Sequence, residues 1–509
     1  MATALSCDLL IKGGHVVDPA NGINGVGDVA LSGGKVVAVT APTSGGAAAG
    51  TSEGAAGGTT SGDGRGPSGT GSRSLDIRPA RVLDAHGCYV IPGVIDLHVH
   101  LSSKYGGRVA HGMLARAGVT TALDMGGPAA DVIRQAGEHG AGLTAACLEG
   151  LAPKVNLSGP DASAVDLRRA AEKGLVDGAI GVKIHFDNAL TPEAAGRAIE
   201  EANRQGIWVA FHCGTTATAS DITGLREAVA LAGRNRLHLA HVNSYCRGNV
   251  KEPAVEALEA IDLLKSAPHL FSESYLAVIN GTSARCVNGE PVLSRVKMWL
   301  GMGGFPGTQE GLRQAILAGW ARINSVVGDD TVLATGAEGV AAWEAAGTNI
   351  GLSFPVNPPI PRLMLATTKD DAGRFVVDAL GTDGGGIPRN VLLSAGMQLV
   401  QMEMLSVSDL VRKLSWTPSR VIGLAQKGHL SEGADADVTV VEPLSRRART
   451  TIAGGEVVMH EGVVFGRGTT FVTTERGAAA VAATPGCRAK VIDVTRTGFY
   501  TGDGLKDAV

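Results

Sequence analysis

Six residues of metal-binding type stand at or near the ends of short apolar runs in this sequence. They are spread from the first third of the chain to the last, in the order His98, His100, Lys183, His212, His241 and Asp383. Neutral imidazoles and carboxylates are ligands that a borderline divalent ion such as zinc takes in proteins. The pattern therefore predicts a metal site assembled from several strands.

His98 and His100 are the most specific pair of this set. They close the run PGVIDLHVH, and alternate residues of a strand share a face, so both rings can reach one ion while Val99 points away. An isolated histidine is usually a packed or surface residue, but this spacing at an apolar strand end favours ligation. His185 is the rival ligand among the other histidines, because it shares a strand face with Lys183.

Lys183 is the unusual member, because an ammonium group among metal cations would be repelled. Nearby metals lower the pKa of a lysine, and the neutral amine can react with CO2 to give a carbamate, an anion able to bridge two metals. We therefore expect a carbamylated Lys183. The alternatives are a simple salt-bridged lysine at this position and Lys154 as the modified residue.

A repeating scaffold is needed to bring these residues together. Between residues 91 and 425, strand-like runs alternate with amphipathic segments such as PEAAGRAIEEANRQG; the strand candidates are TTALDM, LTAACLEG, AIGVKIHF, IWVAFHC, LHLAHVN and VVDALGTD. Repeated βα units imply a parallel sheet, and this many favour a closed barrel. We predict an α/β protein with a (β/α)8 TIM barrel, whose active site lies at the carboxyl ends of the strands.

The segments on either side of the barrel have β-strand patterns without the alternating helical segments. Residues 1–90 and 426–475 carry short β-strand patterns with Gly turns, and we expect them to combine into one small β-sandwich. Within the first segment, residues 43–73 form a Gly/Ser/Thr/Ala tract that we predict to be a disordered insertion. Residues 476–509 give no clear signal, and we interpret them as a C-terminal extension.

Composition excludes several classes of function. The net charge is −4 and there are only five Trp and five Tyr, which argues against nucleic-acid binding. Neither a signal-peptide pattern nor an apolar run of membrane-spanning length is present, so we expect a cytoplasmic protein without a membrane partner. The seven cysteines are scattered, which makes a disulfide framework improbable.

Several motifs resemble the amidohydrolase superfamily over nearly the whole chain. They are PGVIDLHVH, SWTPSRVIGL and GHLSEGADADVTVVEP; VNPPIPR some 20 residues before GTDGGG resembles the dihydroorotase and hydantoinase branch. The resemblance implies two divalent metals, one on His98, His100, carbamylated Lys183 and Asp383, the other on Lys183, His212 and His241. It also implies attack by a metal-bridged hydroxide, with Asp383 as general base and then general acid.

The sequence departs from that branch where substrate would bind. GVKIHF lacks the tyrosine of the hydantoinase-like form, and more than 100 residues separate His241 from VNPPIPR, which is longer than usual for the branch. Residues after His241 and in SESY are the candidate substrate contacts, and Arg247 has the guanidinium fork that suits a carboxylate. The candidates are Asn243, Ser244, Tyr245, Arg247, Glu273, Ser274 and Tyr275.

These inferences predict a hydrolase of a C–N amide bond in a small molecule, most simply a cyclic amide or ureide such as a hydantoin, dihydropyrimidine or lactam. A deacylase of linear N-acyl amino acids, or an isoaspartyl-dipeptidase-like enzyme, shares the barrel and a similar metal set. A non-catalytic scaffold and a subunit of a formyl-transferring complex are further alternatives. Barrels of this branch often form dimers or tetramers, so we expect a homo-oligomer.

Overall fold

Eight parallel strands form the central barrel of the computed structural model, which describes residues 5–42 and 77–505. In spatial order they are β6 (Val94–His100), β7 (Val119–Gly126), β8 (Ala141–Gly150), β9 (Gly181–His185), β10 (Trp208–His212), β11 (His238–Leu239), β12 (Phe271–Tyr275) and β19 (Ala379–Gly381). The short β20 (Gly384–Gly385) follows β19 and pairs with β6, which closes the sheet on itself. The predicted (β/α)8 barrel is confirmed. The predicted insertion 43–73 lies outside the described residues.

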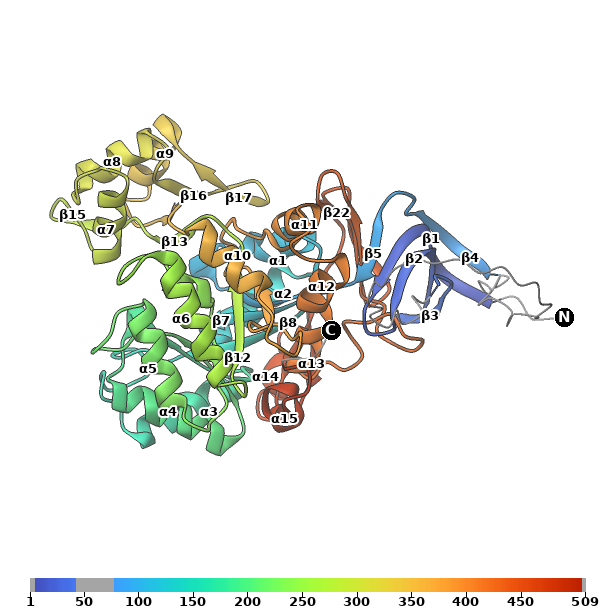
Figure 1. Cartoon of the computed structure of the whole chain (residues 1–509), viewed down its shortest axis with the longest axis horizontal. Helices are drawn as coiled ribbons and strands as arrows, with labels where there is room; N and C mark the ends of the chain where they lie inside the picture. The colour runs from blue at the N-terminus through green and yellow to red at the C-terminus, as the bar shows by residue number, and fades with distance from the viewer. Residues whose placement is uncertain (1–4, 43–76, 506–509) are drawn as a thin grey trace, which may run out of the picture.

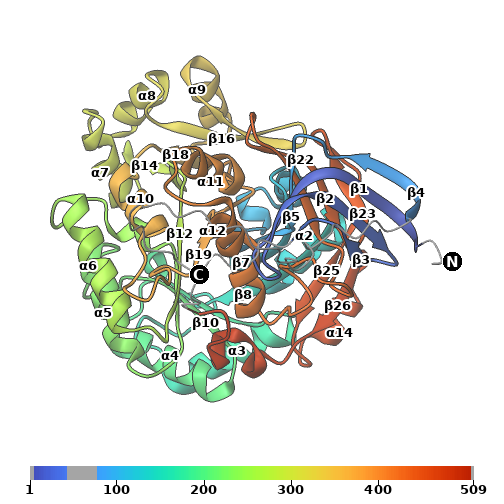
Figure 2. The ribbon, with the colours of Figure 1, turned by 45° about the vertical axis from the view of Figure 1, so that its right-hand side comes forward.

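Helices follow the barrel strands in turn and cover the outside of the sheet (Figures 1 and 2). They are α1 (Gly107–Arg116), α2 (Ala129–His139), α3 (Ala164–Val176), α4 (Pro192–Gln205), α5 (Ile222–Ala232), α6 (Pro253–Ser266), α10 (Pro359–Thr367) and α11 (Leu392–Gln401). Local signals set their starts; Ser163, Thr191 and Asp221, for example, each accept a backbone N–H as N-caps of α3, α4 and α5. Among the described helices, none has the length and apolarity needed to cross a membrane.

The two ends of the chain meet in a second, β-rich unit, which Figure 1 shows beside the barrel at the N-terminal end. Strand β5 (Tyr89–Pro92) pairs with β1 (Leu5–Asp18) on one side and with β21 (Val438–Glu442) on the other. The remaining strands of this sheet are β2 (Ile23–Ser32), β3 (Lys35–Val39), β4 (Ile77–Asp84), β22 (Arg447–Ala453), β23 (Glu456–His460) and β24 (Val463–Val464). Apolar side chains from both chain ends share one core there, as the sequence predicts.

An inserted α+β unit separates β12 from α10. Its antiparallel sheet has the order β13 (Asn280–Ser283), β18 (Gly351–Phe354), β16 (Arg322–Val327) and β17 (Asp330–Ala334), and its helices are α7 (Ser294–Met302), α8 (Gln309–Leu317) and α9 (Gly336–Ala345). The unit has its own apolar core, which includes Trp299, Trp343 and Phe354. The sequence showed a long connection here but did not predict a folded unit.

The C-terminal segment also differs from the expectation. Strand β25 (Gly468–Thr473) lies in the range assigned to the sandwich, yet it pairs with β8 of the barrel and with β26 (Cys487–Val491). Farther on, Phe499 is buried and stacks on Trp208 of β10, with ring centroids 4.3 Å apart and planes 14° apart. Residues 468–505 are therefore packed against the barrel.

Replacing Phe499 with alanine tests this role of the C-terminal segment. The change removes a buried ring from its stack on Trp208, so we expect a loss of about 3–5 kcal/mol in the free energy of unfolding, measured by denaturant titration. Phe465→Ala is the matched control, because Phe465 is 56% exposed. Equal stability of the two variants would show that the segment contributes little.

Candidate metal centre and catalytic cavity

Three of the predicted ligands converge at the carboxyl end of the barrel. One ligand atom from each of His98, His100 and Asp383 lies within 4.8 Å of the other two. The Oδ1 atom of Asp383 is 2.8 Å from His100 Nε2 and 3.5 Å from His98 Nε2. Strand β6 supplies both histidines on one face, and the turn between β19 and β20 brings the carboxylate to them.

A second group of imidazoles lies beside the first. His241 Nε2 is 3.1 Å from His212 Nδ1, and the His241 ring stacks on His98 with centroids 5.0 Å apart. The ring of His185, the rival ligand, has its centroid 4.3 Å from that of His212. The Nδ1 atom of His185 accepts a hydrogen bond from the backbone N–H of Asp187, so only its Nε2 atom is free to bind a metal ion.

Hydrogen bonds to neighbouring side chains fix the orientation of three of these rings. His98 Nδ1 is 2.5 Å from Glu273 Oε1, His241 Nδ1 is 2.7 Å from Ser244 Oγ, and His212 Nε2 is 2.8 Å from Ser220 Oγ. Each ring thus has one nitrogen held by the protein and the other facing the site, as metal-binding histidines do. Burial, the largest cause, lowers the pKa of each of the three rings well below its ordinary value, which keeps them neutral.

Lys183 is buried on β9, between the two groups in strand order. Its Nζ lies 3.7 Å from the Met125 sulfur, and no carboxylate of the described residues lies within the 4.0 Å of an ion pair. Burial lowers its pKa to about 8, while the charges of Glu273 and Asp383 act in the opposite direction. A buried amine without an ion-pair partner fits carbamate formation. Lys154, the alternative, is exposed.

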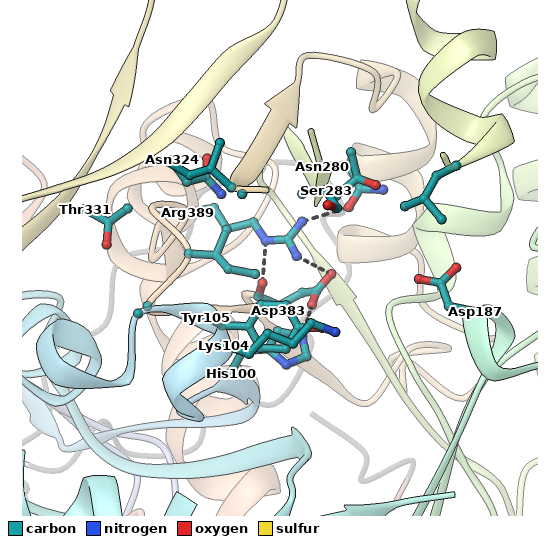
Figure 3. A pocket seen from close by; sticks show the side chains of 18 of the residues that line it. His100, Lys104, Tyr105, Asp187, Asn280, Ser283, Asn324, Thr331, Asp383 and Arg389 are labelled. Carbon is teal, nitrogen blue, oxygen red and sulfur yellow. Dashed lines mark hydrogen bonds and ion pairs between the residues drawn. The ribbon is translucent and has the colours of Figure 1, made fainter. Parts of the chain in front are cut away.

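Asp383 is held from the other side by Arg389. The guanidinium Nη2 is 2.6 Å from Asp383 Oδ2, Nη1 donates to Asn280 Oδ1 at 2.8 Å, and Nε donates to the Asp383 carbonyl (Figure 3). Burial raises the pKa of Asp383, but the charge of Arg389 and the hydrogen bond to His100 act in the opposite direction and hold this pKa well below its usual value. Asp383 and His241 both have left-handed φ angles, 54° and 34°, a strained geometry that is common at functional sites.

A cavity of about 830 Å³ opens above these groups, a size suited to a small molecule. Its floor includes His98, His100, His212, His241 and Asp383. Its wall includes His185 at the end of β9, Asp187 just after that strand and Arg389 after β20, and its far side is formed by the inserted unit. The cavity therefore places a bound molecule between the candidate ligands and the insertion.

The predicted substrate contacts do not line this cavity. Asn243, Ser244, Tyr245, Glu273, Ser274 and Tyr275 are buried behind the floor. Arg247, the predicted carboxylate-binding residue, donates instead to Asn357 Oδ1 (3.0 Å), the Ser244 carbonyl (2.6 Å) and Tyr275 Oη (2.9 Å). Ser244 and Glu273 serve to orient histidines, and Tyr245 Oη accepts the Cys213 N–H. The structure thus places this group outside the lining of the cavity, and a role in contacting substrate stays a prediction.

The sequence also missed residues that shape the site. Asp96, two residues before His98, accepts from the backbone and hydroxyl of Thr382 (3.2 and 2.6 Å) and so joins β6 to the Asp383 turn. Nothing in the sequence indicated a role for Arg389 in the site, apart from its position six residues after Asp383. Asp96 could have been found, because it shares a strand face with His98 and His100.

Comparison with known proteins agrees with this geometry. The sequence pattern of the Amidohydrolase family matches residues 89–269 and 361–469, which is more than half of the chain. The chain belongs to the amidohydrolase family. This amidohydrolase is 24% identical to a dihydroorotase of Syntrophus aciditrophicus (strain SB) over 462 residues, which cover 86% of this chain and 89% of the relative. It is therefore a hydrolytic, metal-dependent enzyme of the dihydroorotase and hydantoinase branch.

Solved structures share the fold. An N-acyl-D-glutamate deacylase from Bordetella bronchiseptica, complexed with zinc and a phosphonate inhibitor, superposes with a TM-score of 0.61 at 13% identity, covering 91% of this amidohydrolase and 99% of that chain. A dihydropyrimidinase from Brevibacillus agri gives a TM-score of 0.55 at 14% identity, with coverages of 94% and 98%. At such identities the likeness shows the fold alone.

Replacing Glu273 with glutamine tests how the histidines are held. Loss of the carboxylate weakens the hold on the His98 ring, so we expect zinc affinity, measured by chelator competition, to fall about 10- to 100-fold. Glu256→Gln is the control, because Glu256 is also buried but accepts from the loop amides of Gly248, Val250 and Lys251. An unchanged zinc affinity in Glu273→Gln, or an equal fall in both variants, would contradict the assigned role.

Proposed function

We propose that this amidohydrolase opens a cyclic amide or ureide by hydrolysis of its C–N bond at a site for two zinc ions. The observation that supports this most directly is the set of oriented imidazoles, each with one nitrogen facing a cavity that also holds Asp383. A relative that covers most of the chain is a dihydroorotase, which favours a ring as the substrate.

The residues fit two adjacent metal positions. His98, His100 and Asp383 already present three donor atoms within 4.8 Å, and His212 and His241 present two nitrogens 3.1 Å apart. A carbamate on Lys183 would supply one oxygen to each position. When bound, two divalent ions polarise the substrate carbonyl and lower the pKa of a water molecule towards neutrality.

The chain's own groups then handle the proton and the substrate. Asp383 accepts the proton of the attacking water on its carboxylate and returns it to the leaving nitrogen. Arg389 keeps that carboxylate turned towards His98 and His100 by its 2.6 Å contact to Oδ2.

Metal content measured with bicarbonate present tests the role of Lys183. We expect two ions per chain in the wild type and one or none in Lys183→Ala, because the bridging carbamate is lost. Lys154→Ala is the control, since Lys154 is an exposed lysine of the loop that follows β8. One ion in both the wild type and Lys183→Ala would contradict the bridged pair and indicate a mononuclear site.

A deacylase of linear N-acyl amino acids is the second candidate, favoured by the fold similarity to the N-acyl-D-glutamate deacylase. Matched panels separate the two, with hydantoin, dihydrouracil and dihydroorotate against N-acetyl amino acids of both configurations. We expect turnover of the cyclic panel and a loss of about 100- to 10,000-fold in kcat for Asp383→Asn, because general acid–base transfer is removed. Turnover of the linear panel alone would support the deacylase.

A further inference from the structure

We infer that the inserted unit, residues 280–356, binds a carboxylate of the substrate and that Arg285 is the residue that pairs with it. The inference rests on the proposed function and narrows it to amides that carry an acidic substituent. The insertion lies in the stretch 270–360 that the family pattern leaves unmatched, so these contacts are not part of the shared scaffold.

The insertion forms the roof of the catalytic cavity. Half of the residues that line the cavity belong to it, including Asn280, Thr282, Arg285, Arg295 and Asn324. In Figure 3, Asn280, Ser283 and Asn324 lie above Arg389, whereas His100 and Asp383 lie below it. A molecule whose amide reaches the candidate metal ligands must therefore present its remaining groups to this roof.

Two sets of contacts fix the roof to the barrel. At the turn between β16 and β17, Arg108 Nη2 donates to the Gly328 carbonyl at 2.8 Å, and Arg116 is 3.7 Å from the Asp330 carboxylate. On the other side, Arg295 of α7 forms an ion pair with Asp187, which follows β9. The roof is thus held over the mouth at both sides, and its side chains occupy defined positions.

The charge of the cavity wall is opposite to that of the whole protein. Four Lys or Arg side chains line the cavity (Lys104, Arg285, Arg295 and Arg389) against two Asp (187 and 383), an excess of 4 − 2 = 2 positive charges, while the chain carries −4. A cavity lined by one sign of charge concentrates ligands of the opposite sign.

Two of these four cations are already neutralised. Arg389 pairs with Asp383 and Arg295 with Asp187. For Lys104 and Arg285, no carboxylate of the described residues lies within 4.0 Å. Arg285 is the one contributed by the roof, and its planar fork suits the two oxygens of a carboxylate.

The inner face of the roof carries polar side chains together with apolar ones such as Val326 and Ile350. Asn280 and Thr282 alternate along β13 and so share a face, and Asn324 and Thr331 come from β16 and β17. The side-chain amides of Asn280 and Asn324 are groups of this lining that can donate hydrogen bonds to a carboxylate beside Arg285.

Two ring compounds of the same shape test the inference. Hydantoin-5-acetic acid carries the carboxylate, and hydantoin-5-acetamide replaces it with a neutral amide. We expect wild-type enzyme to have the higher kcat/KM for the acid, and Arg285→Gln to lower the acid-to-amide ratio about 10-fold, the equivalent of 1.4 kcal/mol. Arg313→Gln is the control, because Arg313 is a partly exposed arginine of the same insertion that pairs with Glu344 and does not line the cavity.

The possible results distinguish a wrong assignment of Arg285 from a wrong proposed function. An unchanged ratio in Arg285→Gln, or a fall only in a Lys104→Gln variant, would overturn the assignment to Arg285. If wild type hydrolyses neither these two compounds nor any member of the cyclic panel above, cyclic-amide hydrolysis is contradicted. Calorimetric affinities of the same proteins for the same two compounds then test the subsite alone: an acid preference that Arg285→Gln removes supports it, and equal affinities refute it.

Discussion

The buried carboxylate of Glu273 joins the two groups of candidate ligands. One oxygen lies 2.5 Å from His98 Nδ1 and 2.6 Å from the backbone nitrogen of His241, so a single side chain of β12 positions residues from β6 and from the end of β11. Burying a carboxylate is costly; here Oε1 makes both contacts, and Oε2 is buried without a hydrogen-bond partner among the described residues. Glu273 therefore holds the His98 ring in one orientation and fixes the backbone at His241.

Two further buried charged residues, Asp96 and Arg389, position Asp383. Asp96 ties β6 to the turn that carries Asp383, and Arg389 holds the Asp383 carboxylate while reaching Asn280 of the insertion. The shared barrel thus supplies the groups for C–N hydrolysis, and the insertion supplies the surface that meets the rest of the substrate. Function within one fold varies in this way, because loops change while the strand ends stay in place.

The sequence predicted the barrel and the β-rich unit, because apolar runs that end in His, Lys or Asp and alternate with helical segments are typical of barrel strands that carry a site. That all six candidate residues bind metal stays a prediction. The sequence prediction failed at β12, where Ser272, Glu273 and Ser274 interrupt the apolar pattern; those polar residues face buried partners that only the fold brings near. It misplaced Arg247 for the same reason, since Asn357, more than 100 residues away, accepts its Nε–H. The insertion was not predicted as a folded unit; its antiparallel sheet departs from the βα repeats by which the barrel was recognised.

The central claim is that the oriented side chains hold two adjacent metal ions linked through a modified Lys183. Anomalous diffraction at the zinc edge, from crystals grown with zinc and bicarbonate, tests this most directly. The account predicts two anomalous peaks, one beside His98, His100 and Asp383 and one beside His212 and His241, with extra density on Lys183 Nζ. A single peak with an unmodified Lys183, or a peak bound by His185 instead of His212, would contradict it.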